Sequence, residues 1–208
     1  MVSDKLSSEF CECSLKHSIF YLSGQVDFLN CGIKNGGWNP PHVTLDMLHM
    51  ISPEEGCKGI FQPCDKYLSI FKAVEQTSNV PATLLMSIAM QESHCDATLT
   101  GPNGEIGIMQ LTKENCKGNG WDVKTNIQLG ANLFKSYLDQ AGGNALQALG
   151  QYNGWQKGMT YAQATSTKYG CYAQNNLDYL DSTCNGWLQG KDGYGQEFKT
   201  YNNLAKCN

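Results

Sequence analysis

The sequence contains no arginine, and none of its fifteen lysines is adjacent to another. Nineteen acidic residues outnumber these lysines, so the chain carries a net charge of -4. Proteins that bind nucleic acids usually present a dense cluster of basic side chains to the phosphates. Nucleic acid is therefore not an expected partner of this protein.

Long apolar runs are also missing, and no segment approaches the roughly twenty residues of a membrane-spanning helix. We therefore expect no membrane partner. The 208 residues, of which 41% are hydrophobic and 16% charged, are typical of a globular domain that needs no metal to fold. We predict a monomeric protein in which residues 1–40 form an N-terminal arm that wraps the main part of the domain, residues 41–208.

The N-terminus lacks the apolar stretch of a secretory signal peptide, and the sequence contains no N-glycosylation acceptor. Its ten cysteines are nevertheless an even number without the C-x-x-C spacing of zinc sites. We therefore predict five disulfides, a secreted, extracellular location, and no metal or other cofactor. Cys95 and Cys116 bracket a glycine-rich loop, which makes them a candidate pair.

Apolar residues recur at helical spacing in six segments, and capping residues mark most of their ends. The predicted helices are a short one after Thr44 and others near residues 65–79, 81–92, 122–141, 144–154 and 173–180. Strand character is limited to the segment after Glu105. These patterns predict a mainly α fold, a disulfide-stapled helical bundle around a central buried helix with a short strand or loop segment.

The predicted central helix follows Pro81, is apolar on nearly all sides, and ends in an acidic residue, Glu92. The helix dipole presents partial negative charge at this end, and the surroundings are apolar, so both effects disfavour ionisation of the carboxyl. A carboxyl that stays protonated near neutral pH can donate a proton to a glycosidic oxygen. The alternative is a helix-end glutamate that points to water.

A loop with three glycines, Gly101, Gly104 and Gly107, follows this helix. Glycine lets a backbone approach a ligand closely. Gln110 can donate hydrogen bonds to a sugar and accept them, although a loop-anchoring role is equally consistent with its position. Glu105 is a candidate second catalytic carboxylate, or else a solvated turn residue.

Four motifs in the central part of the chain together resemble one family of glycosidases. They are QES at 91–93, GIMQ at 107–110, NIQLGANLF at 126–134 and YNG at 152–154. In this order they resemble glycoside hydrolase family 23, the lytic transglycosylases and goose-type lysozymes, over residues 65–155. The segments NPPHVTLDML and NGWLQGKDGYG are similar to secreted fungal members. The resemblance implies a lysozyme-like α+β catalytic domain in residues 41–208.

The resemblance also implies roles for individual residues. The family's catalytic acid matches Glu92, its glycan-binding glutamine matches Gln110 beside Met109, and its substrate-positioning tyrosine matches Tyr152. The implied substrate is the β-1,4-linked chain of N-acetylmuramic acid and N-acetylglucosamine in peptidoglycan. Glu92 would protonate the bridging oxygen, while the substrate's acetamido group would stabilise the positive charge that develops on the sugar.

Other positions extend this set or depart from it. Asn153 and Trp155 adjoin Tyr152 and are further candidate substrate-binding residues, Trp155 as an aromatic face for a sugar. Goose-type enzymes have an aspartate where this chain has Thr112, and many lytic enzymes have a serine where it has Gly101. Hydrolysis and anhydro-sugar formation therefore both stay open, since Glu105 could replace the missing acid.

Two alternatives to a peptidoglycan-cleaving enzyme stay open as well. The acidic balance of the chain favours chitin over an anionic cell wall, which attracts basic proteins more readily. Loss of the second carboxylate would also fit a glycan-binding module without catalytic activity, because a fold does not fix a function.

Overall fold

The computed structural model describes residues 25–207, so predictions about the first part of the arm lie outside the described residues. The elements before the central loop are α1 (Val26–Leu29), η1 (Leu45–Met47), α2 (Pro53–Cys57), η2 (Gln62–Tyr67), α3 (Leu68–Ser78) and α4 (Ala82–Ser93). The elements after it are α5 (Val123–Gln140), α6 (Ala145–Tyr152), α7 (Tyr161–Ala164), η3 (Cys171–Ala173), α8 (Tyr179–Asp181), η4 (Ser182–Gly186), η5 (Trp187–Gln189), η6 (Gln196–Phe198) and η7 (Leu204–Cys207). The predicted mainly α fold is confirmed.

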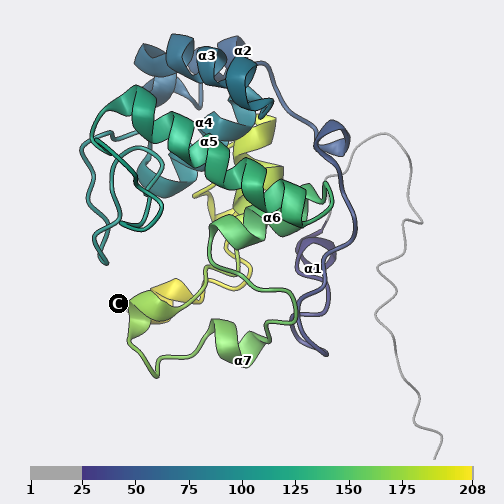
Figure 1. Cartoon of the computed structure of the whole chain (residues 1–208). Coiled ribbons are helices and arrows are strands. Elements are labelled where there is room, and N and C mark those ends of the chain that lie inside the picture. The colour runs from purple at the N-terminus through teal and green to yellow at the C-terminus, as the bar shows by residue number, and fades with distance from the viewer. Residues whose placement is uncertain (1–24, 208) are drawn as a thin grey trace, which may run out of the picture.

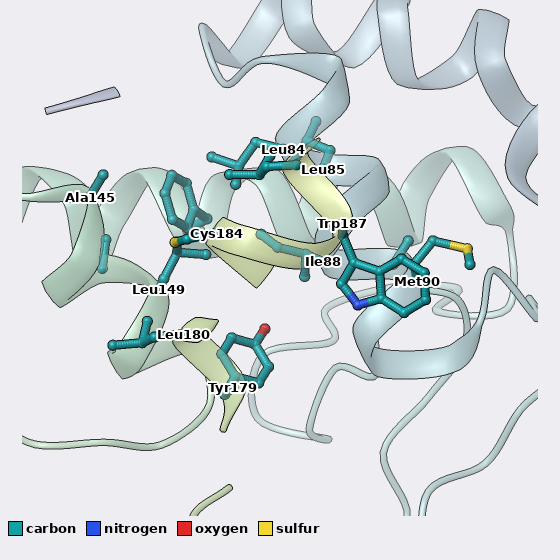
Figure 2. Packing of buried hydrophobic residues seen from close by; sticks show 14 of the residues in the cluster. Leu84, Leu85, Ile88, Met90, Ala145, Leu149, Tyr179, Leu180, Cys184 and Trp187 are labelled. Atoms are coloured by element: carbon teal, nitrogen blue, oxygen red, sulfur yellow. The ribbon is translucent and has the colours of Figure 1, made fainter. Parts of the chain in front are cut away.

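The central buried helix of the prediction is α4. It contacts α2, α3, α5, η4 and η5, and Figure 1 shows it among these elements rather than on the outside. Leu84, Leu85 and Ile88 have no solvent exposure. Figure 2 shows them in one cluster with Leu180, Cys184 and Trp187 of the C-terminal segment. Because α4 packs against other elements on several sides, the side chains at its C-terminal end are restricted in conformation.

The two long helices after the loop begin at the predicted caps. The Asp122 side chain accepts a hydrogen bond from the Thr125 backbone amide at 2.9 Å, and Asn144 caps α6 in the same way. Between these helices Gly142 and Gly143 adopt positive φ angles of 61° and 86°, which glycine does without strain. The helices therefore pack against each other across a tight turn (Figure 1).

The predicted helix over residues 173–180 is wrong. The chain is extended after η3, and the Asn176 side chain accepts a hydrogen bond from the Asp178 backbone amide in a local turn. Asparagine side chains often compete with the helical hydrogen-bond pattern in this way. Helical geometry resumes at Tyr179 and passes at once into the π-helical turn η4 and then η5.

The loop between α4 and α5 contains the strand-like contacts of the described residues. These are isolated bridges that pair Ile106 with Thr100 and with Leu111. The prediction placed strand character after Glu105, which is right for Ile106 and Leu111, but Thr100 lies before that residue. The bridges fold the loop back on itself beside the end of α4.

Residues 25–40 pack against the rest of the domain. Trp38 is fully buried, its indole donates a hydrogen bond to the Leu29 carbonyl, and its backbone amide bonds to the Met159 carbonyl. A Cβ atom on Gly150 would lie 2.2 Å from the Trp38 ring, so α6 needs glycine at this point. The domain boundary at residue 40 stays a prediction.

The predicted disulfide pattern is wrong in two respects. Cys95 bonds to Cys64 rather than to Cys116. Cys57, Cys116 and Cys184 are free thiols, so five disulfides do not form. Cys57 and Cys184 are buried like other small apolar side chains, a use of cysteine that an even count in the sequence does not reveal. None of the described helices has the length and apolar character to cross a membrane.

Candidate active site

Glu92 occupies the last turn of α4, where the helix is brought to an end by two residues in the left-handed conformation, His94 and Cys95. The Tyr179 hydroxyl donates a hydrogen bond of 2.8 Å to Glu92 Oε1. Burial raises the pKa of the Glu92 carboxyl to about 7; the Tyr179 hydrogen bond opposes this rise, and the negative charge of Glu105 adds to it. Glu92 is thus a carboxyl that exchanges protons near neutral pH.

Three tyrosines surround Glu92. Burial and the nearby Glu92 charge raise the pKa values of Tyr152 and Tyr179 well above the ordinary range, and they raise that of Tyr194 to about 12. All three phenols therefore stay protonated and can donate hydrogen bonds. The Tyr152 hydroxyl bonds to the Met109 carbonyl at 3.0 Å, and the Tyr194 hydroxyl lies 2.9 Å from the carbonyls of Met90 and Gln91.

Gln110 is held in an unusual backbone conformation, with a φ of 44°. Its side-chain amide donates hydrogen bonds to the carbonyls of Leu99 and Gly107, which leaves Oε1 as the remaining acceptor. Strained backbone of this kind persists where the surroundings fix it and often occurs at functional sites. The Gln110 amide thus anchors the loop, and the binding of a glycan by Oε1 stays a prediction.

Glu105 lies over Gly101. A Cβ atom on Gly101 would come within 2.3 Å of Glu105 Oε2 and 2.6 Å of Gln110 Oε1. Glu105 and Gln110 thus already occupy the space beside Gly101. A larger side chain, such as the serine that many lytic enzymes carry at this position, would not fit there. The backbone amide and the side-chain amide of Asn103 each donate a hydrogen bond to the Glu105 carboxylate, at 3.0 and 3.1 Å.

Asn126 and Gly130 explain the NIQLG motif. The buried Asn126 side chain accepts a hydrogen bond from the Met109 amide and donates to the carbonyls of Ile106 and Gly120. One helical turn later, a Cβ atom on Gly130 would lie 2.9 Å from the Met109 side chain. Residues four apart share a face of a helix, so one face of α5 fixes the backbone of the loop and receives its methionine.

Some of the predicted substrate-binding residues belong to the core. Trp155 is fully buried with its ring edge against Trp38, at a centroid distance of 4.9 Å, so it offers no face to a sugar. The Met109 side chain is also fully buried. Asn153 accepts hydrogen bonds from the Trp155 indole and from the Asn175 side chain, which ties together the segment after α6. Burial of this kind cannot be read from an aromatic residue next to a motif.

Tyr179, Tyr194 and Asn126 were not singled out from the sequence. Tyr179 and Tyr194 lie more than eighty residues after Glu92 in the chain, and their contacts depend on how the C-terminal segment folds back. Asn126 lies within the NIQLGANLF motif. It is a polar residue on the apolar face of a predicted helix, and this is the signal in the sequence that could identify it. Among the described residues, no group of three or more His, Cys, Asp and Glu side chains is arranged to hold a metal.

The family model for the Transglycosylase SLT domain matches residues 69–170, slightly less than half of the chain. That segment contains Glu92, the loop and Tyr152, but neither Tyr179 nor Tyr194.

Two solved structures are similar over part of their length. A complex of the 70-kDa soluble lytic transglycosylase with bulgecin A is 25% identical, with a TM-score of 0.41 over 43% of this chain and 17% of that one. The 70 kDa soluble lytic transglycosylase from Escherichia coli is 19% identical, with a TM-score of 0.41 over 65% of this chain and 24% of that one. This chain therefore spans less than a quarter of either structure.

Proposed function

We propose that this protein cleaves the β-1,4 bonds between N-acetylmuramic acid and N-acetylglucosamine in peptidoglycan, as a lytic transglycosylase with Glu92 as the acid and base. The observation that carries the proposal is the half-buried Glu92 carboxyl, whose pKa is raised to about 7 beside the loop that presents Gln110. The family match over residues 69–170 supports the same reaction class. General acids of glycosidases need a carboxyl that is protonated near neutral pH.

The geometry suits a carboxyl that changes its charge during the reaction. In the first step, protonated Glu92 transfers its proton to the glycosidic oxygen, and the bond from that oxygen to the anomeric carbon breaks. The substrate's acetamido oxygen then stabilises the positive anomeric carbon. Tyr179 donates to Glu92 Oε1, a contact that favours the carboxylate formed in this step.

In the second step, ionised Glu92 removes the proton from the C6 hydroxyl of the muramic sugar, whose oxygen then bonds to the anomeric carbon. The product is a 1,6-anhydro sugar, and Glu92 is protonated again. Gln110 Oε1, which faces the space beside Gly101, would accept a hydrogen bond from the N-acetyl group or a hydroxyl. Tyr152 would act as a positioning residue, because its hydroxyl holds the Met109 carbonyl beside Gln110.

Hydrolysis is the second candidate reaction. The Glu105 charge lies near enough to raise the pKa of Glu92, so Glu105 could in principle activate a water molecule. However, both hydrogen bonds that Asn103 donates engage the Glu105 carboxylate. We therefore assign Glu105 an electrostatic role rather than that of a base.

Digestion of purified peptidoglycan, analysed by mass spectrometry, tests the proposal. We expect products with anhydro ends, which are one water lighter than hydrolysed ends. Hydrolysed ends would instead support the second candidate. A matched digestion of chitin oligomers tests the alternative substrate, and binding without cleavage of either polymer would establish a glycan-binding module.

We also propose that the protein is secreted into an oxidising environment. The Cys64–Cys95 disulfide supports this location, since such bonds persist mainly outside the reducing cytosol. Alkylation of the protein as its cells produce it, without added reductant, should leave Cys64 and Cys95 unlabelled in mass spectrometry. Labelling of both residues would contradict the proposal.

A further inference from the structure

A small polar pocket lies next to the catalytic end of α4 and has no role in the cleavage step described above. Its volume is about 130 Å³, well below the roughly 300–1,000 Å³ of pockets that enclose a drug-sized ligand. The residues that line it include Gln91, Asn176, Asp178, Ser182, Tyr194 and Lys199. A cavity of this size suits a side group of a substrate.

The pocket is coupled to the active site through α4. Gln91 directly precedes Glu92, and the Tyr194 hydroxyl lies 2.9 Å from the Gln91 carbonyl. The Tyr179 that binds Glu92 belongs to the same short segment as Asp178 and Ser182. A glycan that places its scissile bond at Glu92 would therefore bring nearby substituents to this pocket.

The acceptor groups of three lining residues, Asp178, Asn176 and Gln91, are already in use. The two Asp178 oxygens accept hydrogen bonds from the backbone amides of Tyr201 and Asn202, at 2.8 and 2.6 Å. The Asn176 carbonyl oxygen accepts from the Asp178 amide, and the Gln91 carbonyl oxygen accepts from the Trp187 indole at 2.7 Å. Asp178 thus anchors the chain after η6, with both carboxylate oxygens engaged by backbone amides.

The lining retains donors and one positive charge. The side-chain NH2 groups of Gln91 and Asn176 are not engaged by any described residue, since only their carbonyl oxygens are. The exposed Lys199 ammonium forms no ion pair within the described part of the chain. Groups that donate and carry positive charge select acceptors with negative charge.

We infer that this pocket binds a carboxylate on the lactyl-peptide substituent of the muramic acid sugar, with Lys199, Asn176 and Gln91 as its donors. The inference rests on the proposed function, because it assigns a substituent of the same substrate. Chitin has no carboxylate, so the pocket would make the enzyme prefer peptidoglycan. The carboxylate could be that of the lactyl group itself or one on the peptide stem, and the two sources can be separated by experiment.

The test compares three preparations of peptidoglycan strands. The first has intact peptide stems, the second has the same stems with every carboxylate amidated by ethanolamine, and the third has its stems removed by an amidase so that the lactyl carboxylate is free. KM and kcat are measured for the wild-type protein, for Lys199→Gln and for Asn176→Ala. The control is Lys191→Gln, since Lys191 is also exposed on the C-terminal segment but does not line the pocket.

We expect a KM for intact strands about two- to fivefold below that for amidated strands, the range for a partly exposed ion pair. Lys199→Gln should abolish this preference with kcat unchanged, Asn176→Ala should weaken it, and Lys191→Gln should retain it. A KM for stem-free strands that is also below that for amidated strands shows that the lactyl carboxylate, which is free only once the stem is removed, can bind. A low KM confined to intact strands identifies a carboxylate of the stem. Either result supports the inference.

Equal KM values for intact, amidated and stem-free strands would overturn the inference, as would an equal effect of Lys191→Gln and Lys199→Gln. Absence of cleavage of every strand would contradict the proposed function instead. In that case the carboxylate preference is measured as strand binding by calorimetry, with the same four proteins, and loss of the preference there overturns the pocket assignment on its own.

Discussion

Glu92 and Glu105 are two carboxyl groups of the candidate site, and they lie in different environments. Glu92 ends a helix whose apolar side chains are buried on several sides, and its one hydrogen-bond donor among the described side chains is the Tyr179 phenol. Glu105 lies in the glycine-rich loop and receives two amide hydrogen bonds from Asn103. A half-buried carboxyl with few donors favours its protonated form. We therefore assign proton transfer to Glu92, and to Glu105 the negative charge that raises the pKa of Glu92.

The strongest test of this contrast removes the acid at the end of α4. Glu92→Gln should lower kcat on peptidoglycan by at least about a thousandfold, because general acid–base catalysis supplies roughly 10²–10⁴ and this residue would serve in both steps. Circular dichroism should show an unchanged helical fold. The wild-type activity should fall as pH rises through about 7, since the first step needs protonated Glu92. Retained activity in Glu92→Gln would remove the mechanism.

The same variant should change stability in a pH-dependent manner. The pKa of Glu92 is about 7 in the folded protein, against a model value of 4.5 for an unperturbed carboxyl. The folded state thus binds more protons between these values, and the wild type loses stability as pH rises through that window. Glu92→Gln should be more stable than the wild type at pH 8, by at most about 3 kcal/mol. Chemical denaturation at pH 8 and at pH 4 measures this, and the difference should vanish at pH 4.

The next largest effect should come from the support of the loop. Asn126→Ala removes three hydrogen bonds and leaves the Met109 amide and the Gly120 carbonyl without these partners, whereas the Ile106 carbonyl keeps the Leu111 amide. We expect a loss of roughly 2–4 kcal/mol in the free energy of unfolding and a marked rise in KM, because the Gln110 backbone would no longer be fixed. Denaturant titration and steady-state kinetics measure both. Gln128→Ala, on the same helix but at its surface, is the control. An unchanged KM would show that the loop positions itself without α5.

A smaller effect is expected when the Tyr179 hydroxyl is removed. Its hydrogen bond lowers the pKa of Glu92, so Tyr179→Phe should raise that pKa and move the alkaline limb of the activity profile to higher pH. A role limited to packing would leave the limb in place, because phenylalanine keeps the ring. The pH dependence of kcat/KM distinguishes the two. Tyr194→Phe provides a comparison, since that hydroxyl binds backbone carbonyls rather than Glu92.

Glu105→Gln should have the smallest effect if the loop only supplies charge. The variant removes a negative charge that raises the pKa of Glu92, so the alkaline limb should move to lower pH by a fraction of a unit. We expect kcat at the optimum to stay within about fivefold of the wild type. A loss of about a hundredfold or more, the effect of removing a general base, would instead make Glu105 catalytic and favour hydrolysis.

The sequence predicts those parts of the site that depend on local patterns. The apolar α4, its terminal Glu92 and the caps Asp122 and Asn144 follow from periodicity and capping, which act between near neighbours. The partners of Glu92 in the C-terminal segment cannot be predicted in this way, because no short-range pattern in the sequence specifies where Tyr179 will lie. The Cys64–Cys95 bond likewise depends on how η2 approaches the end of α4. The prediction that Trp155 binds substrate fails for a different reason. It rested on the position of this residue beside a motif, which does not show whether the side chain is buried.

The π-helical turn η4 limits how this part of the chain can vary in length. Tyr179, before the turn, binds Glu92, and Trp187, immediately after it, binds Gln91. A π turn holds more residues than an α turn, so it sets the angle between these two side chains. Deletion of one residue between them would rotate Trp187 by about 100° about the helix axis. Insertions and deletions should therefore accumulate elsewhere in the C-terminal segment and spare the seven residues between this tyrosine and this tryptophan.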